Sequence, residues 1–523
     1  MTSSPAPLSG PAADLTSTDL ANVTQSRATG EDYSRMQRTD TLGRIARWDG
    51  VADSLESGGV RLSGAYHRRL EHVYSLSIPK GARVLEVGSA RGDLLASLEP
   101  AHGVGIDFAP KMVAAARQRH PGLTFLEADA QQLAEAISQA EADASDRPFD
   151  YVILSDLVND LRDVQAVLEQ VHKVCGPRTR VMINTYSRVW EKPLAAVGKA
   201  GLARPMIGQN WLTPHDLRNL LHLAGFETLR TWQEVLLPLR IPGVAGLCNR
   251  FLVKLPGLRH LALSNFLIAR PAPTAATQPK PEDVVVSVLV PARNEAGNIE
   301  NILRRTPQMG AGTELIFVEG GSSDPTWQAI ERVAAEHLDW GKGIKIMKQD
   351  GKGKGDAVRK GFDAATGDVL MILDADMTVP PEDLPRFFDA WCSGKGEFVN
   401  GVRLVYPMAD QAMRVLNLIG NKFFSYAFTW LLGQPIRDTL CGTKVLSRTD
   451  YRRVADGRHY FGDFDPFGDF DLLFGAAKLN LRICDLPIRY QARTYGDTNI
   501  QRWRSGVVLL RMTAYAARRL KFV

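Results

Sequence analysis

The chain has 523 residues, too many for one domain, so two or three domains are expected. Its 45% hydrophobic and 23% charged residues are ordinary for a globular enzyme, and a net charge of +5 is too small to predict a nucleic-acid partner. The five cysteines lack CxxC spacing, which argues against a zinc site or a disulfide scaffold and fits a reducing cytosol.

The first segment, residues 1–40, is expected to be a disordered tail because Ser, Thr, Ala and Pro dominate it. It lacks the basic and then apolar order of a secretory signal. No apolar run in the chain is long and uncharged enough to predict a membrane-spanning helix. These features predict a cytoplasmic location, with any membrane contact peripheral and on the inner face of the membrane.

A proline-rich stretch divides the rest of the chain. RPAPTAATQPKPEDV holds four prolines among small residues, which predicts a linker at 271–283 between a first domain, 41–270, and a second, 284–523. In both domains apolar runs alternate with helix-like patterns, which predicts two α/β folds, each a parallel sheet covered by helices. The expected strands are 83–88, 103–107, 123–129, 149–156 and 180–187, then 284–292, 314–321, 344–350 and 368–376.

A strand, a glycine turn and an acidic residue stand in series in the first domain. Glu86, Gly88 and Gly92 lead from the strand into a helix, where glycines let the backbone approach a ligand and the helix start offers unpaired N–H groups. Asp107 ends the next strand about 20 residues on, where a carboxylate can hold ribose hydroxyls. This order predicts a nucleotide-like cofactor.

The same series, followed by FLEADAQQL, FDYVILSDLVNDL and LTPHDLRNLLHLAGFE, resembles the class I S-adenosylmethionine-dependent methyltransferases over residues 80–230. The resemblance implies a Rossmann-like fold that binds S-adenosylmethionine. It implies that Glu86, Gly88 and Gly92 border the methionine portion of the cofactor. It further implies that Asp107 borders the ribose, Asp129 the adenine and Asp156 the methyl acceptor. A cofactor-binding module without methyl transfer is the alternative.

Two carboxylates follow an apolar run in the second domain. In GDVLMILDADMTVPP, residues 369–373 lead directly to Asp374 and Asp376. Residues i and i+2 of a strand share a side, so the carboxylates are expected to converge at the carboxyl end of a central parallel strand, where ligands of open sheets bind. Two hard oxygen ligands suit Mg²⁺ or Mn²⁺, with a substrate diphosphate completing the shell. A turn or helix cap is the other role open to either residue.

The segments VSVLVPARNEAGNIENIL, ELIFVEGGSSDPT, GKGKGDAVRKGFDAATGD and LDADM resemble, in this order, the family 2 glycosyltransferases with a GT-A fold, and the resemblance spans about 285–500. It implies a nucleotide-sugar donor, with Asp374 and Asp376 as metal ligands. The implied donor-binding residues are Pro291, Ala292 and Glu295 at the base and ribose, then Glu319, Lys354 at the diphosphate, and Asp374. Gly320 replaces the second acid of the usual V-D-D-G-S motif, which leaves the base preference open.

Later segments, NGVRLVYP, RDTLCGTKVLSR and LPIRYQARTYGDTNI, are similar to the polyprenyl-phosphate branch of that family, of the dolichyl-phosphate mannose synthase type. That branch moves a sugar onto a lipid phosphate, and the cations expected near the acceptor are Arg403, Lys444 and Arg493. FGDFDLLF takes the place of the family's E-D-x-E segment, so Asp469 and Asp471 are the candidate catalytic carboxylates. A hydroxyl acceptor would need Asp469 as base, whereas a phosphate acceptor, with a second pKa of about 6, could dispense with one.

We therefore expect a bifunctional enzyme. One activity is metal-dependent transfer of a sugar from a nucleotide-sugar to a polyprenyl phosphate or an envelope glycan, and the other is S-adenosylmethionine-dependent methylation of an acceptor that the sequence does not specify. The first alternative is a glycosyltransferase whose other domain only binds the cofactor and regulates. The second is a nucleotidyltransferase, against which the segments around Asp374, Lys444 and Asp469 argue.

Two helical segments predict peripheral contact with an anionic membrane. Residues 501–523 carry six basic residues and no acid, and Arg504, Arg511 and Arg518 recur every seven residues on one helix face. The apolar surface expected beside them is Val507, Val508, Leu510 and Tyr515. Such a helix fits an anionic lipid interface, and residues 412–433 are expected to provide a second contact.

Overall fold

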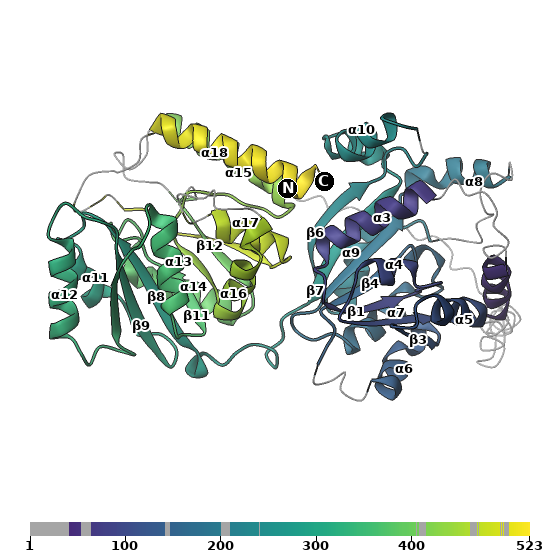
Figure 1. The fold of residues 1–523 in the computed structure, drawn as a ribbon, viewed down its shortest axis with the longest axis horizontal. Coiled ribbons are helices and arrows are strands. Elements are labelled where there is room, and N and C mark those ends of the chain that lie inside the picture. The colour runs from purple at the N-terminus through teal and green to yellow at the C-terminus, as the bar shows by residue number, and fades with distance from the viewer. Residues whose placement is uncertain are drawn as a thin grey trace, which may run out of the picture.

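The computed structural model describes residues 41–53, 64–141, 147–199, 210–239, 241–403, 405–406, 415–460, 468, 470–491, 493, 495 and 502–522. Within these residues the chain forms two seven-stranded sheets, each covered by helices and lying in a separate half of the molecule (Figure 1). The prediction of two α/β domains is confirmed.

The first sheet has the strand order β3-β2-β1-β4-β5-β7-β6, in which only β7 runs antiparallel to its neighbours among the described strands. The strands are β1 Arg83–Val87, β2 His102–Asp107, β3 Thr124–Glu127, β4 Tyr151–Ser155, β5 Arg180–Tyr186, β6 Phe226–Glu234 and β7 Ser264–Pro271. The order reverses between β1 and β4, and a sheet of this kind binds ligands at that point, beyond the carboxyl ends of its strands.

Helices cover both faces of this sheet (Figure 1). They are α3 Gly64–Ser77, α4 Asp93–Ser97, α5 Pro110–Arg119, α6 Leu133–Ala140, α7 Val164–Lys173, α8 Glu191–Lys199, α9 Pro214–Leu223 and α10 Val244–Arg250. A further helix over 41–53 precedes them. Strands β6 and β7 were not expected from the sequence, since β6 is a half-buried edge strand with no apolar run and β7 returns to the sheet after 29 intervening residues.

The second sheet has the order β10-β9-β8-β11-β13-β12-β14. Its strands are β8 Val285–Ala292, β9 Gly312–Glu319, β10 Ile344–Lys348, β11 Val369–Ile372, β12 Phe398–Val402, β13 Lys444–Ser447 and β14 Ile483–Pro487. Its helices are α11 Ile299–Arg305, α12 Thr326–Glu336, α13 Lys354–Ala364, α14 Leu384–Cys392, α15 Val415–Leu432, α16 Arg448–Asp456, α17 Phe470–Lys478 and α18 Arg502–Ala516, which the π-helical segment η9, Ala517–Lys521, continues.

Strand β11 is central and fully buried, as its apolar run predicts, but it is not parallel on both sides. It pairs in parallel with β8 and antiparallel with β13. It also ends at Ile372, two residues before the first carboxylate, and the Met377 amide donates to the Asp374 carbonyl at 3.1 Å. A turn, not the alternation of a strand, therefore brings Asp374 and Asp376 to one side, and the strand-based reason for their convergence was wrong.

Helix α18 lies along the second domain beside α15 (Figure 1). Leu509, Met512 and Ala516 enter the same core cluster as Phe424 and Phe428 of α15, because apolar residues three and four apart share one helix face. The opposite side of α18 remains in solvent, with Val507 and Leu510 each about half exposed. None of the described helices is long and apolar enough to cross a bilayer.

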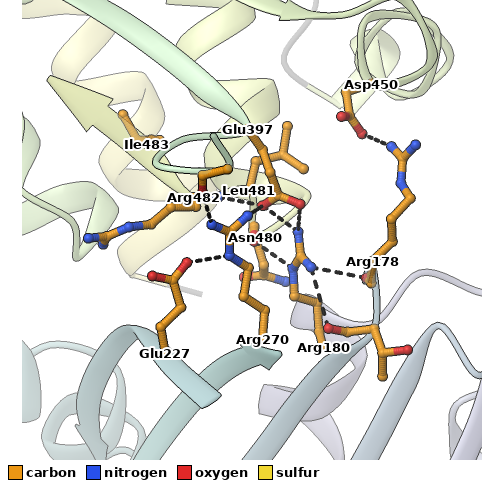
Figure 2. Close-up of polar contacts among 12 residues, drawn as sticks. Arg178, Arg180, Glu227, Arg270, Glu397, Asp450, Asn480, Leu481, Arg482 and Ile483 are labelled. Atoms are coloured by element: carbon orange, nitrogen blue, oxygen red, sulfur yellow. Dashed lines mark hydrogen bonds and ion pairs between the residues drawn. The ribbon is translucent and has the colours of Figure 1, made fainter. Parts of the chain in front are cut away.

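Buried ion pairs hold the two domains together. Arg180 of β5 donates from both ends of its guanidinium, through Nη2 to the Glu397 carboxylate at 2.7 and 2.8 Å and through Nε to the Asn480 carbonyl at 2.8 Å. Arg270 of β7 lies 3.2 Å from the same carboxylate and also pairs with Glu227 (Figure 2). Because these side chains come from both sheets, the network fixes one domain against the other.

We expect Glu397→Gln to lower the free energy of unfolding by about 3 kcal/mol, because it leaves two buried guanidinium groups without their carboxylate. Burial alone would raise the pKa of Glu397, but Arg180 and Arg270 hold it below its ordinary value. A lowered carboxylate pKa stabilises the fold above the unfolded-state pKa, about 4.3, and this contribution is lost as the pH falls through the native pKa. Urea unfolding of both proteins at pH 7 and pH 3 measures this.

The matched control is Glu382→Gln, which removes a solvent-exposed pair with Arg305. Exposed pairs contribute about 0–1 kcal/mol, so the control should unfold almost as the parent does. Equal destabilisation by the two substitutions, or an effect of Glu397→Gln that persists undiminished in acid, would contradict the assignment.

Candidate functional sites

The glycine turn after β1 forms a tight cradle at the carboxyl end of the first sheet. Gly88 and Gly92 have φ angles of 76° and 72°, which side chains rarely adopt. A Cβ on Gly92 would lie 2.4 Å from the Phe125 ring, so the backbone passes its neighbours closely. Glu86 is buried at the strand end, accepts from the Leu95 amide at 3.1 Å, and burial raises its pKa to about 8.

Asp107 organises the same loop from the end of β2. Its Oδ2 accepts from the Ala90 amide and its Oδ1 from the Ala109 amide, both at 2.9 Å, while burial raises its pKa. Asp129 stands after the neighbouring strand β3 and caps a short helical turn through the Gln131 amide at 2.9 Å. The structure thus brings the predicted methionine, ribose and adenine residues to the ends of adjacent strands.

Asp156, the predicted acceptor-side residue, lies at the centre of a buried hydrogen-bond network. Its Oδ1 accepts from Tyr66 at 2.8 Å and from the Asn184 amide at 2.5 Å, and Tyr186 approaches its Oδ2 at 3.4 Å. Burial raises the pKa of Asp156 to about 6, and its φ of 53° marks a tight turn. A run of polar residues ends β5, a signal that could have indicated Asn184 and Tyr186, whereas nothing in the sequence indicates Tyr66 on α3.

The predicted donor residues of the second domain meet at the ends of β8 and β9. Ala292 is the register partner of Glu319, and Pro291 precedes it. Glu319 is buried and accepts from the Ser322 amide at 2.5 Å. This hydrogen bond fixes the turn that contains Gly320, the residue in place of the motif's second acid. Glu295 is also buried, beside Asn298 at 2.7 Å, and burial, with Asp376 nearby, raises its pKa to about 7.

The two carboxylates after β11 each face a cation. Lys354 Nζ lies 2.7 Å from Asp374 Oδ1, and Arg493 Nη2 lies 2.8 Å from Asp376 Oδ2. Burial opposes ionisation of Asp374, but Lys354 lowers its pKa; burial and the charge of Asp374 raise the pKa of Asp376. Arg493 thus lies beside the metal and donor residues, 3.7 Å from Glu295 as well, although it was expected near the acceptor phosphate.

These carboxylates fit a divalent cation that is shared with substrate. Only two hard oxygen donors come from the side chains, and no group of three His, Cys, Asp or Glu that could hold a metal occurs among the described residues. Mg²⁺ usually takes one or two carboxylates together with water and substrate phosphates, which matches this donor set. Asp374 and Asp376 would therefore hold Mg²⁺ or Mn²⁺ together with a nucleoside diphosphate.

Arg403, which is mostly buried, and Lys444, which is fully buried, lie close enough to Asp374 to affect its charge. Arg403 forms a two-pronged pair with the buried Asp438, at 2.7 and 2.9 Å, and the Lys444 ammonium donates to the Cys441 carbonyl. After the opposing effect of burial and the larger effect of Lys354, both cations help to lower the pKa of Asp374. Their position supports the electrostatics of the donor site, and contact with an acceptor stays a prediction.

The two candidate catalytic carboxylates are only partly placed. Asp469 lies outside the described residues. Asp471 opens α17, is buried and pairs with Arg458 at 2.7 Å, with Arg359 at 3.7 Å. Both arginines approach Oδ2 of Asp471, and a catalytic role for this carboxylate stays a prediction.

Three further residues shape the donor site and were not expected from the sequence. Asp324 accepts from the Ala296 amide at 3.2 Å and so joins the loops after β8 and β9. The Tyr495 ring covers Gly297, where a Cβ would lie 2.6 Å from it. Gly442 brings backbone against Asp374 and Lys354, since a Cβ there would lie 2.1 Å from Asp374 Oδ2. The glycine inside DTLCGTK was the sequence signal that could have indicated Gly442.

Family comparisons agree with this division of the chain. Residues 61–231 match a family model described as a methyltransferase domain, and residues 287–454 match the model for glycosyl transferase family 2. Glycosyltransferase AglD of Haloferax volcanii is 28% identical over 235 residues, which is 44% of this chain and 36% of that protein. Dolichol-phosphate mannosyltransferase of Pyrococcus furiosus is 32% identical over 112 residues, 21% of this chain and 30% of that protein, so both relatives are matched over about a third of their length.

Among solved structures, glucosyl-3-phosphoglycerate synthase of Mycobacterium tuberculosis, in complex with Mn²⁺, uridine diphosphate and product, is 19% identical with a TM-score of 0.33 and covers 45% of this chain and 80% of its own. The two family matches fall on the two sheets with their candidate sites. The chain therefore joins a region that matches the methyltransferase domain model, 61–231, to a region that matches the model for glycosyl transferase family 2, 287–454.

Proposed function

We propose that the second domain transfers a sugar from a nucleotide-sugar to a polyprenyl phosphate or an envelope glycan, and that the first domain uses S-adenosylmethionine to methylate an acceptor whose identity is open. The observation that carries the first activity is the half-buried pair Asp374 and Asp376, faced by Lys354 and Arg493 beside the donor residues. The similarity to a dolichol-phosphate mannosyltransferase supports a lipid-phosphate acceptor.

The proposed sugar transfer is a displacement at the anomeric carbon. An acceptor oxygen forms a bond to that carbon while the bond to the diphosphate oxygen breaks, and the nucleoside diphosphate leaves with the electron pair. When bound at Asp374 and Asp376, Mg²⁺ or Mn²⁺ would neutralise charge on the diphosphate. Lys354 would approach the same diphosphate, and Glu319 and Glu295 would fix the loops around the nucleoside.

The direct test incubates the purified chain with single nucleotide-sugars, a divalent metal and a polyprenyl phosphate. Mass spectrometry should show a lipid-linked sugar, with release of nucleoside diphosphate. Release of pyrophosphate instead would identify a nucleotidyltransferase. The natural product can be found by comparing lipid-linked sugars from cells with and without the protein.

The substitution Asp469→Asn tests whether the acceptor is a phosphate or a hydroxyl. We expect a near-normal rate, because a phosphate acceptor is already ionised near neutral pH and needs no base. Turnover is measured under substrate saturation, with circular dichroism to show an intact fold. Collapse of turnover in a folded variant would instead assign a hydroxyl acceptor, with Asp469 as its base.

The methyltransferase proposal rests on the cradle at Gly88 and Gly92 with Asp107 and Asp156 on either side. Methyl transfer needs mainly proximity and a deprotonated acceptor, so no further catalytic constellation is required. The alternative is a domain that binds the cofactor and regulates. Calorimetric titration with S-adenosylmethionine, followed by assay for methyl transfer to lipid-linked glycans, separates the two: binding without transfer favours regulation.

We also propose that the protein contacts an anionic membrane through both domains. Phe423 and Tyr426 on α15 and Val507 and Leu510 on α18 are exposed apolar residues beside exposed Arg511. Val508 and Tyr515, expected in the same surface, are half-buried. Cations next to exposed apolar side chains fit an anionic lipid interface, where each cation contributes roughly 1 kcal/mol.

The first domain extends this apolar surface. Ile241, Val244 and Leu247 in and before α10 are exposed, and no acidic residue occurs between Glu234 and Glu282. The two parts adjoin, because the Phe251 and Phe522 rings lie 5.5 Å apart and Arg250 Nε donates to the Phe522 carbonyl at 2.8 Å. Helices α10, α15 and α18 lie along the same edge of the molecule (Figure 1).

Leu247→Glu and Leu510→Glu should each weaken flotation with vesicles of three parts phosphatidylcholine to one part phosphatidylglycerol by about tenfold, because each puts a charge where an apolar side chain would enter the interface. Higher salt should weaken binding of the parent chain too. These substitutions are cleaner than removal of residues 511–523, since that truncation would also take Met512 and Ala516 out of the core.

The matched control is Leu338→Glu, at a leucine that is 81% exposed and follows α12, a helix at the end of the second domain far from α10 (Figure 1). It should float as the parent does. Equal flotation of all three variants would contradict the proposed surface.

A further inference from the structure

A cavity of about 70 Å³ lies at the junction of the two domains. The first domain lines it with α3, β6 and the turn at Lys254, and the second with the ends of α15 and α17 and with η9. None of the residues assigned above to cofactor, donor, metal or acceptor lines it. It is thus a separate feature, formed only where the two domains meet.

The charges that line the cavity are almost all positive. Its cations are Arg69, Arg230, Lys254, Lys478, Arg519 and Lys521, and its one carboxylate is Glu234. Glu234 is already engaged, since Arg69 Nη2 lies 3.0 Å away and the Lys254 ammonium also pairs with it. Within the part of the chain that the structure describes, no ion pair to a carboxylate is formed by the other four cations.

Aromatic rings and backbone hold several of these cations in place. The Arg230 guanidinium lies 4.7 Å from the Trp232 ring, and its buried Nε has no hydrogen-bond partner among the described residues. Lys478 Nζ lies 4.5 Å from the Tyr460 ring and also donates to the Leu76 carbonyl, and Lys521 Nζ lies 5.2 Å from the Trp430 ring. Such contacts order the cationic side chains but leave their charge uncompensated.

Burial and nearby positive charges lower the pKa of two lysines that line the cavity. Burial, with Arg230 nearby, lowers the pKa of Lys478 to about 8. Burial, with Lys254, Arg230 and Arg259 opposing and Glu234 favouring the charged form, lowers the pKa of Lys521 to about 7. The charged forms of both lysines are therefore costly in the ligand-free cavity, and an anion would offset that cost.

The size of the cavity suits a small oxyanion. One water needs about 10–15 Å³ measured in this way, so 70 Å³ has room for a group of several heavy atoms. A phosphate monoester offers three acceptor oxygens and a charge of about −1.5 to −2, which several ammonium and guanidinium donors can share. We propose that the interdomain cavity is a binding site for a phosphate group.

Two sources of that phosphate group are chemically equivalent at the site. One is a phospholipid headgroup, because Lys254 and η9 lead directly into the apolar surface of α10 and α18. The other is a soluble phosphate or diphosphate. In either case the ligand would bridge side chains of both domains and so stabilise their docking, independently of whether either domain turns over substrate.

The test uses the full chain in EDTA, so that metal-dependent binding of diphosphate at Asp374 and Asp376 is absent. Calorimetry with sodium phosphate and with sodium diphosphate should show binding by the parent chain, with proton uptake at pH 7.5 detected by comparing two buffers of different ionisation enthalpy. Lys478→Met and Lys521→Met should each weaken that binding about tenfold, the loss expected for one charge-assisted hydrogen bond. Lys280→Met, at an exposed lysine of the interdomain segment, is the matched control.

A second measurement reports on the fold of these variants. Because each removes an uncompensated charge, Lys478→Met and Lys521→Met should melt no lower than the parent chain in phosphate-free buffer, while phosphate should raise the melting temperature of the parent more than theirs. A lysine that served only to join the domains would instead lower the melting temperature when replaced.

Vesicles of phosphatidylcholine with one fifth phosphatidic acid distinguish the sources. Weaker flotation of both lysine variants than of Lys280→Met supports a lipid headgroup, and loss of soluble phosphate binding with unchanged flotation supports a soluble ligand. Binding of phosphate, diphosphate and vesicles that is the same for the lysine variants and the control would overturn the proposal.

Discussion

Asp376→Asn is expected to reduce sugar transfer by at least about 10²–10³-fold, the loss typical when one electrostatic stabiliser of a developing charge is removed. The substitution keeps the shape of the side chain and its acceptor for Thr378, whose amide and hydroxyl lie 3.1 and 2.8 Å from Oδ1. What it removes is the negative charge that faces Arg493 at 2.8 Å and that would help to hold a divalent cation. The turn should therefore persist while the cation site fails.

The experiment compares initial rates with Mg²⁺ or Mn²⁺ and measures S-adenosylmethionine binding in the same preparations. Asp389→Asn, at an exposed aspartate of α14, is the matched control and should keep full transfer. Cofactor binding by the first domain should be unchanged in both variants. Full transfer by Asp376→Asn, or by the parent chain after treatment with chelator, would refute the metal assignment.

The carboxylate pair shows how far local sequence patterns reach. The apolar run of β11 predicted a buried central strand, and its burial is complete. The strand nevertheless ends at Ile372, and its neighbour β13 is antiparallel. The local pattern could not predict this pairing, because β13 lies more than 70 residues further along the chain. The two carboxylates were thus predicted to converge for a partly wrong reason, because a turn can bring them to one side as the alternation of a strand would.

The cations show the opposite limit. The resemblance and charge complementarity predicted Arg403, Lys444 and Arg493 near an acceptor phosphate; in the structure Arg403 is paired with Asp438 and Arg493 faces Asp376, and contact with an acceptor stays a prediction. Lys478 and Lys521, which form no ion pair with a carboxylate among the described residues, lie where the two domains meet, and composition did not indicate them. A buried cation is identified by its partners, and partners distant in sequence become visible only in the fold.

The first domain shows the same division between local and distant signals. Gly88 and Gly92 could be predicted from the sequence, because a backbone that passes its neighbours closely requires glycine. Tyr66 was not, because its hydroxyl reaches Asp156 from a helix 90 residues earlier. Strand β7 was missed for a similar reason, since its place between β5 and β6 depends on antiparallel pairing rather than on periodicity.

Asp107→Ala is expected to weaken binding of S-adenosylmethionine about 10–100-fold, as loss of hydrogen bonds to a charged acceptor does. The carboxylate has two roles that act in the same direction. It would accept from the ribose hydroxyls, and it already receives the Ala90 and Ala109 amides at 2.9 Å, which hold the glycine turn in shape. Both are lost together in the alanine variant, since both depend on the same carboxylate.

Calorimetric titration with S-adenosylmethionine measures the change, and Glu135→Ala, at an exposed carboxylate of α6, is the control that should bind as the parent does. Nucleotide-sugar binding by the second domain should be the same in all three proteins, because Asp107 belongs to the other sheet. Unchanged affinity of a folded Asp107→Ala chain would remove the ribose assignment. A loss of affinity without any methyl transfer by the parent chain would leave the cofactor site in place and assign the first domain to regulation.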